Sequence, residues 1–90
     1  MKVMYTLEAR HDLAEIHAYI TLQSPLSARS VIARIRGAAA MLGTFPRMGH
    51  AGTETGTQEL GVKGLPHIIV YEIIRKRVVI LDVFHGARER

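Results

Sequence analysis

Cysteine and tryptophan are absent from this sequence, and aromatic residues make up only 6% of it. Without cysteine, the chain can form neither a disulfide nor a thiolate metal site, so its core must be held by packing alone. The absence also fits the reducing cytosol, and we predict a cytoplasmic location. Since 48% of its 90 residues are hydrophobic, we expect one globular domain covering residues 1–90.

Long hydrophobic runs are lacking too. No apolar stretch of signal-peptide length follows Met1 and Lys2. The longest apolar run, residues 68–74, is interrupted by Glu72 and is far shorter than the roughly 20 residues that a membrane-spanning helix needs. We therefore expect no membrane association. The net charge of +4 instead suits an acidic protein surface or a nucleic acid as partner.

The sequence also lacks the spacings that mark metal and phosphate sites. His11 and His17 are six residues apart, and His50 lies in a predicted loop, so no pair has the i,i+4 spacing of a helical ligand pair. The glycines of residues 49–56 do not have the spacing of a phosphate-binding loop and precede no predicted helix. We predict no metal ion and no cofactor.

Two helices are predicted in the first half of the chain. Thr6 can cap the first helix, and Glu8 then lies in its first turn, where the helix dipole favours a carboxylate. An apolar stripe runs from there to about residue 22 and consists of Ala9, Leu13, Ile16 and Ile20. The charged residues off this stripe are predicted to face solvent: Arg10, Asp12 and Glu15.

The second helix has a clear start and end. Ser24 is a typical cap, Pro25 is favoured at the first helical position, and Gly43 is a plausible terminator. Its apolar stripe consists of Ala28, Ile32, Ile35, Ala39 and Leu42. Because the connection between the helices is short, they should form an antiparallel hairpin.

Short β-prone runs surround this hairpin. A first strand is predicted at residues 3–5, and three more at about residues 58–63, 67–75 and 77–85, with a loop over residues 45–57. Gly64 and Pro66 mark one turn, and Arg75-Lys76 marks a tighter one. The resulting order is β-α-α-β-β-β. We therefore predict an α+β fold in which a helical hairpin packs on a small, mostly antiparallel sheet.

Alternation along the last two strands predicts which residues face the helices. One set should form the core: Ile69, Tyr71, Ile73, Val79, Leu81 and Val83. The opposite set is also largely apolar: Ile68, Val70, Glu72, Ile74, Val78, Ile80, Asp82 and Phe84. An apolar face of this size usually marks a partner site, so we expect a protein partner there.

Five segments occur in an order that resembles the RelE/ParE superfamily of bacterial toxins, and the later ones resemble its ParE-like branch. They are Thr6 to Ile16, Phe45-Pro46 with Met48-Gly49, Gly56 to Leu60, Pro66 to Tyr71, and His85 to Arg88. The resemblance implies a toxin of a type II toxin–antitoxin system, neutralised by a small antitoxin encoded beside it. The superfamily includes both ribosome-dependent mRNA interferases and non-catalytic poisons of DNA gyrase.

Departures from the nuclease branch favour the second activity. Metal-free RNA cleavage needs a base, an acid and cations for the phosphate. Where that branch carries an arginine early in the third strand, this chain has Ile68; Gly86 or Ala87 occupies the place of another basic residue, with Arg88 as a shifted substitute. Gln58 also stands where the subgroup often has arginine. The resemblance therefore implies a growth inhibitor that binds a macromolecular target, plausibly DNA gyrase.

These considerations assign candidate roles to particular residues. Antitoxin binding is assigned to Ile68, Val70, Ile80, Phe84, Arg29 and Arg36, and target binding to Arg47, His85, Arg88 and Arg90. The alternative, an mRNA interferase, would use His67, His85, Arg88 and Lys63. A third alternative is an inactive homologue that binds only its antitoxin and, through it, operator DNA. The sequence leaves a homodimer and a toxin–antitoxin heterotetramer open.

Overall fold

The computed structural model describes residues 1–87 and confirms the predicted α+β class. Its elements are, in order, β1 (Lys2–Tyr5), α1 (Leu7–Thr21), α2 (Pro25–Thr44), β2 (His50–Ala51), β3 (Gln58–Gly61), β4 (His67–Ile74) and β5 (Arg77–His85). The predicted helices and strands begin and end within two residues of the observed ones. The two-residue strand β2 was not predicted, because nothing in its loop alternates.

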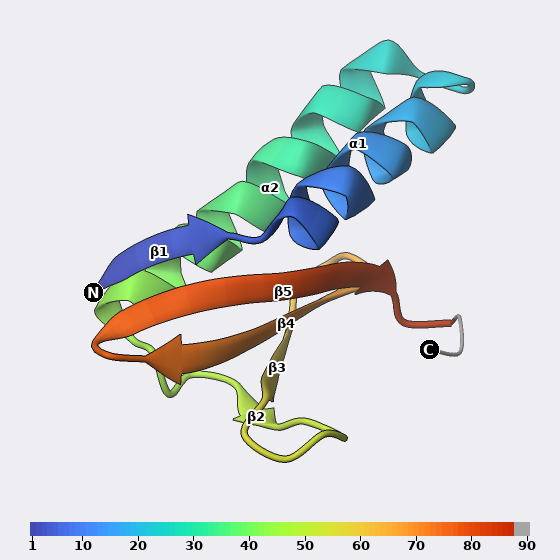
Figure 1. Ribbon diagram of the computed structural model, residues 1–90. Helices are drawn as coiled ribbons and strands as arrows, with labels where there is room; N and C mark the ends of the chain where they lie inside the picture. The colour runs from blue at the N-terminus through green and yellow to red at the C-terminus, as the bar shows by residue number, and fades with distance from the viewer. Residues whose placement is uncertain (88–90) are drawn as a thin grey trace.

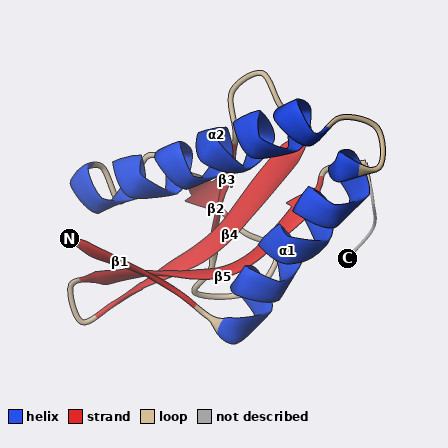
Figure 2. Cartoon of the chain, turned by 90° about the horizontal axis from the view of Figure 1, so that it is seen from above, coloured by secondary structure: helices blue, strands red, loops and turns tan. Residues whose placement is uncertain are grey.

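The fold has two layers. The sheet has the strand order β1-β5-β4-β3-β2, in which only β1 and β5 run parallel, so the predicted mostly antiparallel sheet is confirmed. Both helices lie on the same face of this sheet (Figure 1). From above they form a V, which closes at their connection and opens toward β1 (Figure 2).

Both helices begin at the predicted caps. The Thr6 hydroxyl accepts a hydrogen bond from the Ala9 N–H at 3.1 Å, and the Ser24 hydroxyl accepts one from the Ser27 N–H at 3.1 Å. Thr6 also binds the sheet: its N–H donates to the Ile80 carbonyl at 3.0 Å and its hydroxyl to the Leu81 carbonyl at 3.1 Å. The start of α1 is therefore fixed directly to the middle of β5.

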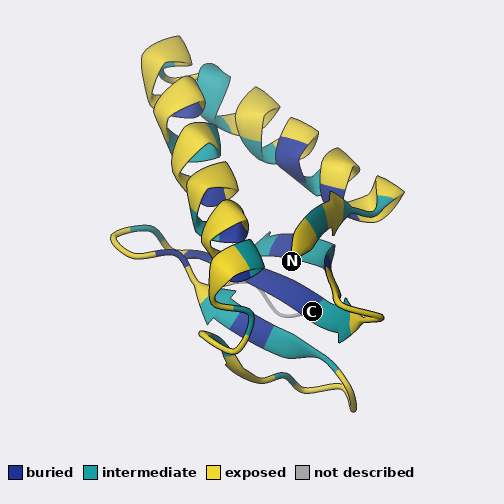
Figure 3. Ribbon diagram, turned by 90° about the vertical axis from the view of Figure 1, so that its left-hand side faces the viewer, coloured by how far each residue is buried: buried dark blue, intermediate teal, exposed yellow. Residues whose placement is uncertain are grey.

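The core lies between the helices and the sheet. The helices bury their inward faces and expose the outward ones (Figure 3). Burial of these apolar side chains is the main source of stability in a fold this small. The buried cluster consists of Ala9, Leu13, Ile35, Ala39, Leu42, Val62, Ile69, Tyr71, Val78, Ile80 and Val83.

Because of a register shift in β5, the side chains of this strand that face the helices differ from the predicted ones. Val70 pairs with Asp82 and Tyr71 with Ile80, so Leu81 is an extra residue without a partner on β4. Such a bulge reverses the alternation of side chains on either side of it. The predicted core positions Val79 and Leu81 are therefore wrong, and the residues that fill the core are Val78 and Ile80, both fully buried.

The sheet face opposite the helices is less exposed than predicted. Val70 is only 1% exposed, while Ile68 and Phe84 pair with each other and are half-buried. Val70 and Ile80 were both assigned as antitoxin contacts, but Val70 is buried and Ile80 lies in the core, so neither offers surface to a partner. The large apolar side chains that are most exposed lie elsewhere: Leu7, Tyr19, Leu22, Leu26, Phe45 and Met1.

Tyr71 fixes the loop that follows α2. The ring is fully buried, as predicted for a core residue. Its hydroxyl donates to the Pro46 carbonyl at 2.8 Å, lies 3.1 Å from Oε1 of Gln58, and accepts from the Gly49 N–H at 3.1 Å. One buried hydroxyl thus holds residues 46–49 against the sheet.

Candidate functional site

His67 and His85 were predicted as separate strand-end residues, but the structure brings them together. They are paired in the β4–β5 register, and their rings meet edge to face with centroids 5.5 Å apart. His67 is only 6% exposed, and its Nδ1 has no hydrogen-bond partner among the described residues. Nδ1 of His85 accepts from the Ala87 N–H at 3.1 Å. The structure therefore contains one buried, unpartnered histidine nitrogen beside a second histidine.

These histidines line a pocket of about 530 Å³, which we call the wedge pocket. It lies between α1, the turn before β4 and the end of β5, and its volume is within the usual range for ligand sites. Its charged lining residues are Asp12 and Glu15, and no lysine or arginine of the described residues lines it. The other residues around it are Ile16, Tyr19, Ile20, Val31, Leu65, Pro66, Val83 and Phe84.

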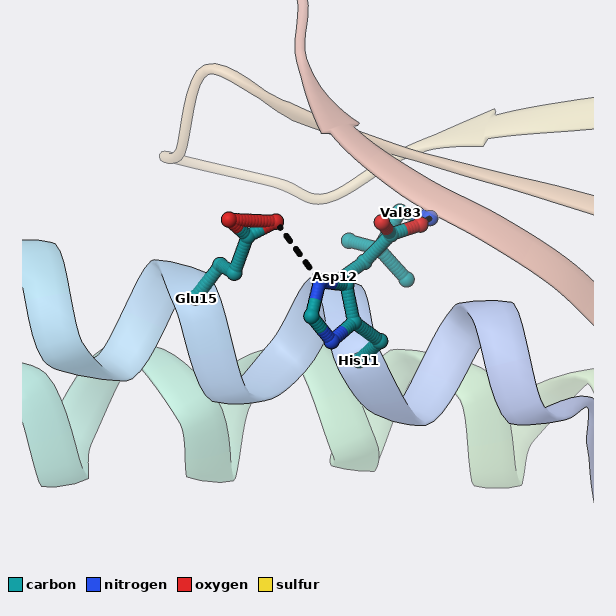
Figure 4. Close-up of polar contacts among 4 residues, drawn as sticks. All are labelled: His11, Asp12, Glu15 and Val83. Carbon is teal, nitrogen blue, oxygen red and sulfur yellow. Dashed lines mark hydrogen bonds and ion pairs between the residues drawn. The ribbon is translucent and has the colours of Figure 1, made fainter.

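Asp12 connects α1 to the end of β5. The parallel partner β1 ends opposite Ile80, which leaves the next part of this edge of β5 without a strand. There the Asp12 carboxylate accepts a hydrogen bond from the Val83 N–H at 2.9 Å (Figure 4). The prediction that Asp12 simply faces solvent is therefore wrong, since its side chain is half-buried and takes over the role of a strand partner.

Glu15 lies one turn further along α1 and is exposed. Its carboxylate is 3.2 Å from Nε2 of His11, and it rises from α1 on the same side as the Asp12 carboxylate (Figure 4). Both side chains are largely exposed, so this contact contributes little to stability. The two carboxylates thus give the α1 wall of the wedge pocket a negative charge.

Replacement of Asp12 by alanine is expected to lower the free energy of unfolding by about 2 kcal/mol, because it removes a charge-assisted hydrogen bond and leaves the Val83 N–H without a partner. Chemical denaturation of both proteins measures this loss. The matched control is Glu15→Ala on the same helix, which loses only an exposed contact and should cost less than about 0.5 kcal/mol. Equal losses in the two variants would show that the Asp12–Val83 contact does not support the fold.

Burial lowers the pKa of His67 below its ordinary value, and the neighbouring His85 lowers the pKa further. The charged form is disfavoured because it loses hydration and meets a second ring that can carry positive charge. At neutral pH His67 is therefore uncharged, with a proton on one ring nitrogen and a lone pair on the other. An uncharged, buried ring can accept a hydrogen bond from a ligand.

This lowered pKa makes stability depend on pH. Below about pH 6.5 the unfolded chain takes up a proton that the folded chain binds only at lower pH, so the free energy of unfolding should fall as the pH falls. The other titratable groups that line the pocket, among residues 1–87, are His85 of β5 and Asp12, Glu15 and Tyr19 of α1. The free energy of unfolding, measured with urea above and below about pH 6.5, should change less with pH for His67→Gln than for the unchanged chain. His50→Gln, which alters an exposed histidine, should keep the full effect.

The remaining candidate residues that the structure describes are not gathered at the wedge pocket. Arg29 and Arg36 lie on exposed positions of α2, and the Arg36 guanidinium stacks 5.3 Å from the centre of the Tyr5 ring. Lys63 follows β3, and its carbonyl accepts a hydrogen bond from Arg34. Arg47 is exposed in the loop after α2. Two further candidates, Arg88 and Arg90, lie outside the described residues, and the roles assigned to all of these remain predictions.

Sequence reasoning missed the acidic wall of the pocket. Asp12 and Glu15 precede the histidines by more than fifty positions, and only the packing of α1 on β5 brings them together. The one signal was that Asp12 stands three residues after Ala9 and four before Ile16, spacings that place it next to the apolar stripe of α1. Among the described residues, no group of three or more potential ligands could hold a metal ion, and no helix is long and apolar enough to cross a membrane.

The chain is similar to two proteins named as a toxin or a candidate toxin. The Sinorhizobium fredii protein Y4kP, named as a candidate toxin, is 39% identical over 98% of this chain and 91% of its own length. Toxin RelE2 of Caulobacter vibrioides is 36% identical over 97% of each chain.

Solved structures share the fold. A chain of the chromosomal ParDE system of Pseudomonas aeruginosa superposes with a TM-score of 0.84 at 22% identity, covering 94% of this chain and 95% of that one. A chain of the Escherichia coli RelBE complex does so with a TM-score of 0.70 at 13% identity, covering 99% and 98%. The family model of the ParE toxin of type II toxin–antitoxin systems, parDE, matches residues 3–90. The chain therefore belongs to the ParE toxin family, within the RelE/ParE superfamily suggested by its motifs.

Proposed function

We propose that this toxin inhibits growth by binding DNA gyrase without cutting nucleic acid, and that the antitoxin encoded beside it neutralises it by binding. The proposal that the toxin does not cut nucleic acid rests on the charge of the wedge pocket, which His67 and His85 line. The wedge pocket has two carboxylates and, among the described residues, no lysine or arginine. A phosphodiester in that pocket would meet negative charge without the cations that phosphate transfer requires. Ile68 at the position of an expected arginine supports the same conclusion.

A gyrase supercoiling assay tests this function. Purified toxin at micromolar concentration should inhibit supercoiling and trap the enzyme's cleaved DNA complex, and toxin mixed beforehand with an excess of antitoxin should not. Unimpaired supercoiling with no trapped complex would contradict gyrase as the target. Arg47→Ala then tests the exposed arginine of the loop after α2, which we propose as a target contact and which should weaken inhibition if it touches the enzyme.

Antitoxin binding is supported by both the comparisons and the surface. The P. aeruginosa and E. coli structures with the same fold are described as toxin–antitoxin systems or complexes. Tyr19, Leu22 and Leu26 are 64%, 84% and 77% exposed at the closed end of the helical hairpin. Large apolar side chains grouped in this way usually mark a protein partner. We propose that the antitoxin covers this end of the hairpin and the half-buried pair Ile68 and Phe84.

A ribosome-dependent mRNA interferase is the second candidate, and the contact between His67 and His85 favours it. Two histidines 5.5 Å apart could serve as acid and base. Primer extension on translated mRNA in induced cells tests this activity. Intact transcripts, or unchanged toxicity after both histidines become alanine, would exclude it. Induction of the chain alone distinguishes both activities from an inactive homologue, because an inactive chain would not arrest growth.

A further inference from the structure

The wedge pocket is acidic although the protein as a whole is basic. The chain carries a net charge of +4, yet Asp12 and Glu15 line the pocket and none of the other described lining residues is lysine or arginine. Charges interact more strongly where protein partly replaces water than they do in bulk solvent. The pocket therefore favours a cationic group and disfavours an anionic one.

His67 lines the same pocket and carries a ring nitrogen without a hydrogen-bond partner in the described part of the chain. Nδ1 of His67 is buried and unpartnered, and a buried polar atom without a partner costs about 1–3 kcal/mol. Arginine and lysine side chains only donate hydrogen bonds, so a lone pair on Nδ1, with the ring proton on Nε2, is the form that could accept from them. Since burial keeps His67 uncharged, this histidine would not repel a cation.

The pocket walls suit the stem of a long side chain. Ile16 and Ile20 line it from α1, and Val83 lines it from β5. Arginine and lysine bury their methylene groups along such apolar surfaces while the charged end reaches polar groups. An aromatic or aliphatic side chain would fill the walls but leave Nδ1 of His67 without a partner and offer no positive charge to the two carboxylates.

We propose that the wedge pocket binds one basic side chain of the antitoxin, an arginine or a lysine, with its stem against Ile16, Ile20 and Val83 and its charged end at the carboxylates and Nδ1 of His67. This inference rests on the proposed function, because it names the chemistry of the antitoxin residue that anchors the complex. The exposed hairpin end leads to the pocket, since Tyr19 belongs to both. A partner chain that covers Leu22 and Leu26 would thus pass the pocket mouth.

Affinity measurements on the toxin–antitoxin complex test whether a basic side chain of the antitoxin binds in the wedge pocket and anchors the complex. Glu15→Gln keeps the shape of the side chain and removes its charge, so it should weaken antitoxin binding about tenfold. Glu8→Gln is the matched control, since Glu8 is exposed on the same helix and does not line the pocket; it should change affinity less than twofold. Each lysine and arginine of the antitoxin is then replaced by alanine in both toxin backgrounds. For one of these residues, the alanine substitution should weaken binding to the unchanged toxin at least fivefold more than it weakens binding to the Glu15→Gln toxin.

A small probe tests the pocket without the antitoxin. Butylguanidinium added to isotope-labelled free toxin should shift the NMR signals of His67, His85 and Val83, whereas butyrate at the same concentration should not. His67→Phe should weaken the response to butylguanidinium. Equal responses to the cation and the anion, or shifts confined to other surfaces, would overturn the proposed chemistry of the pocket.

Different results would contradict the proposed neutralisation by the antitoxin and the proposed basic side chain in the wedge pocket. If unchanged toxin does not bind the antitoxin, the proposed neutralisation is wrong and the anchor with it. If the antitoxin binds tightly but Glu15→Gln behaves like Glu8→Gln and no basic residue couples to it, only the anchor is wrong.

Discussion

Gly49→Ala is expected to lower the free energy of unfolding by about 3 kcal/mol. A Cβ at this position would lie 2.6 Å from the Glu59 carbonyl oxygen and 2.7 Å from the Tyr71 hydroxyl, and neither group can move easily. The first is backbone of β3, and the second belongs to a fully buried ring. Relief of the overlap must therefore displace the loop and break the hydrogen bond from the Gly49 N–H to Tyr71.

Gly37→Ala is the matched control. Gly37 lies in α2, is exposed, and has no atom within 4 Å of the added Cβ. Because glycine is a poor helix former, this substitution should stabilise the protein by about 0.5–1 kcal/mol. Thermal and urea unfolding should therefore shift in opposite directions for the two variants. A Gly49→Ala protein as stable as the unchanged chain would show that residues 46–49 do not pack as described.

A double substitution identifies the cause of the Gly49 effect. Tyr71→Phe removes one of the two overlapping groups, together with the hydroxyl that binds Pro46 and Gly49. Gly49→Ala should then cost about 1 kcal/mol less in the Tyr71→Phe background than alone, since residues in contact do not contribute additively. Equal costs in the two backgrounds would assign the effect to the Glu59 carbonyl and the ring carbon Cε1 of residue 71, which both variants keep.

The elements predicted well are those determined by local sequence. Thr6, Ser24 and Pro25 start the helices by satisfying backbone groups within a few residues, so their effect can be recognised without the fold. The turn at Arg75 and Lys76 is similarly local, although both residues adopt positive φ values of 50° and 62°, which glycine or asparagine would adopt more easily.

Features that depend on the partner strand could not be predicted. The bulge at Leu81 exists because β5 must pair with β4 on one side while Thr6 binds its Ile80 and Leu81 carbonyls on the other. No local pattern shows this, so strict alternation placed Ile80 on the wrong face. The wedge pocket could not be predicted for the same reason, because it forms where α1 packs against strand ends far along the chain.

Ile35→Ala is expected to remove about 3–4 kcal/mol of stability. Ile35 is fully buried in the core cluster, and its truncation leaves a cavity between α2 and the sheet. Ile35→Val removes a single methylene and should cost about 1 kcal/mol. Leu26→Ala, at a site of the same helix that is 77% exposed, should cost less than about 0.5 kcal/mol. Urea unfolding of the three variants should show this order, and a small loss for Ile35→Ala would mean that the core can close around the gap.

The Ile35→Ala variant also connects stability with neutralisation. A 90-residue domain has a total stability of about 5–13 kcal/mol, so this loss would remove a large share of the stability of the free toxin. A partner that binds only the folded chain adds about 2.7 kcal/mol when present at 100 times its Kd. Ile35→Ala toxin should therefore unfold at lower urea when free and regain most of that loss with antitoxin. If antitoxin raised its midpoint no more than that of a non-binding protein, the antitoxin would not select the folded toxin, and the proposed docking on the helical hairpin would be wrong.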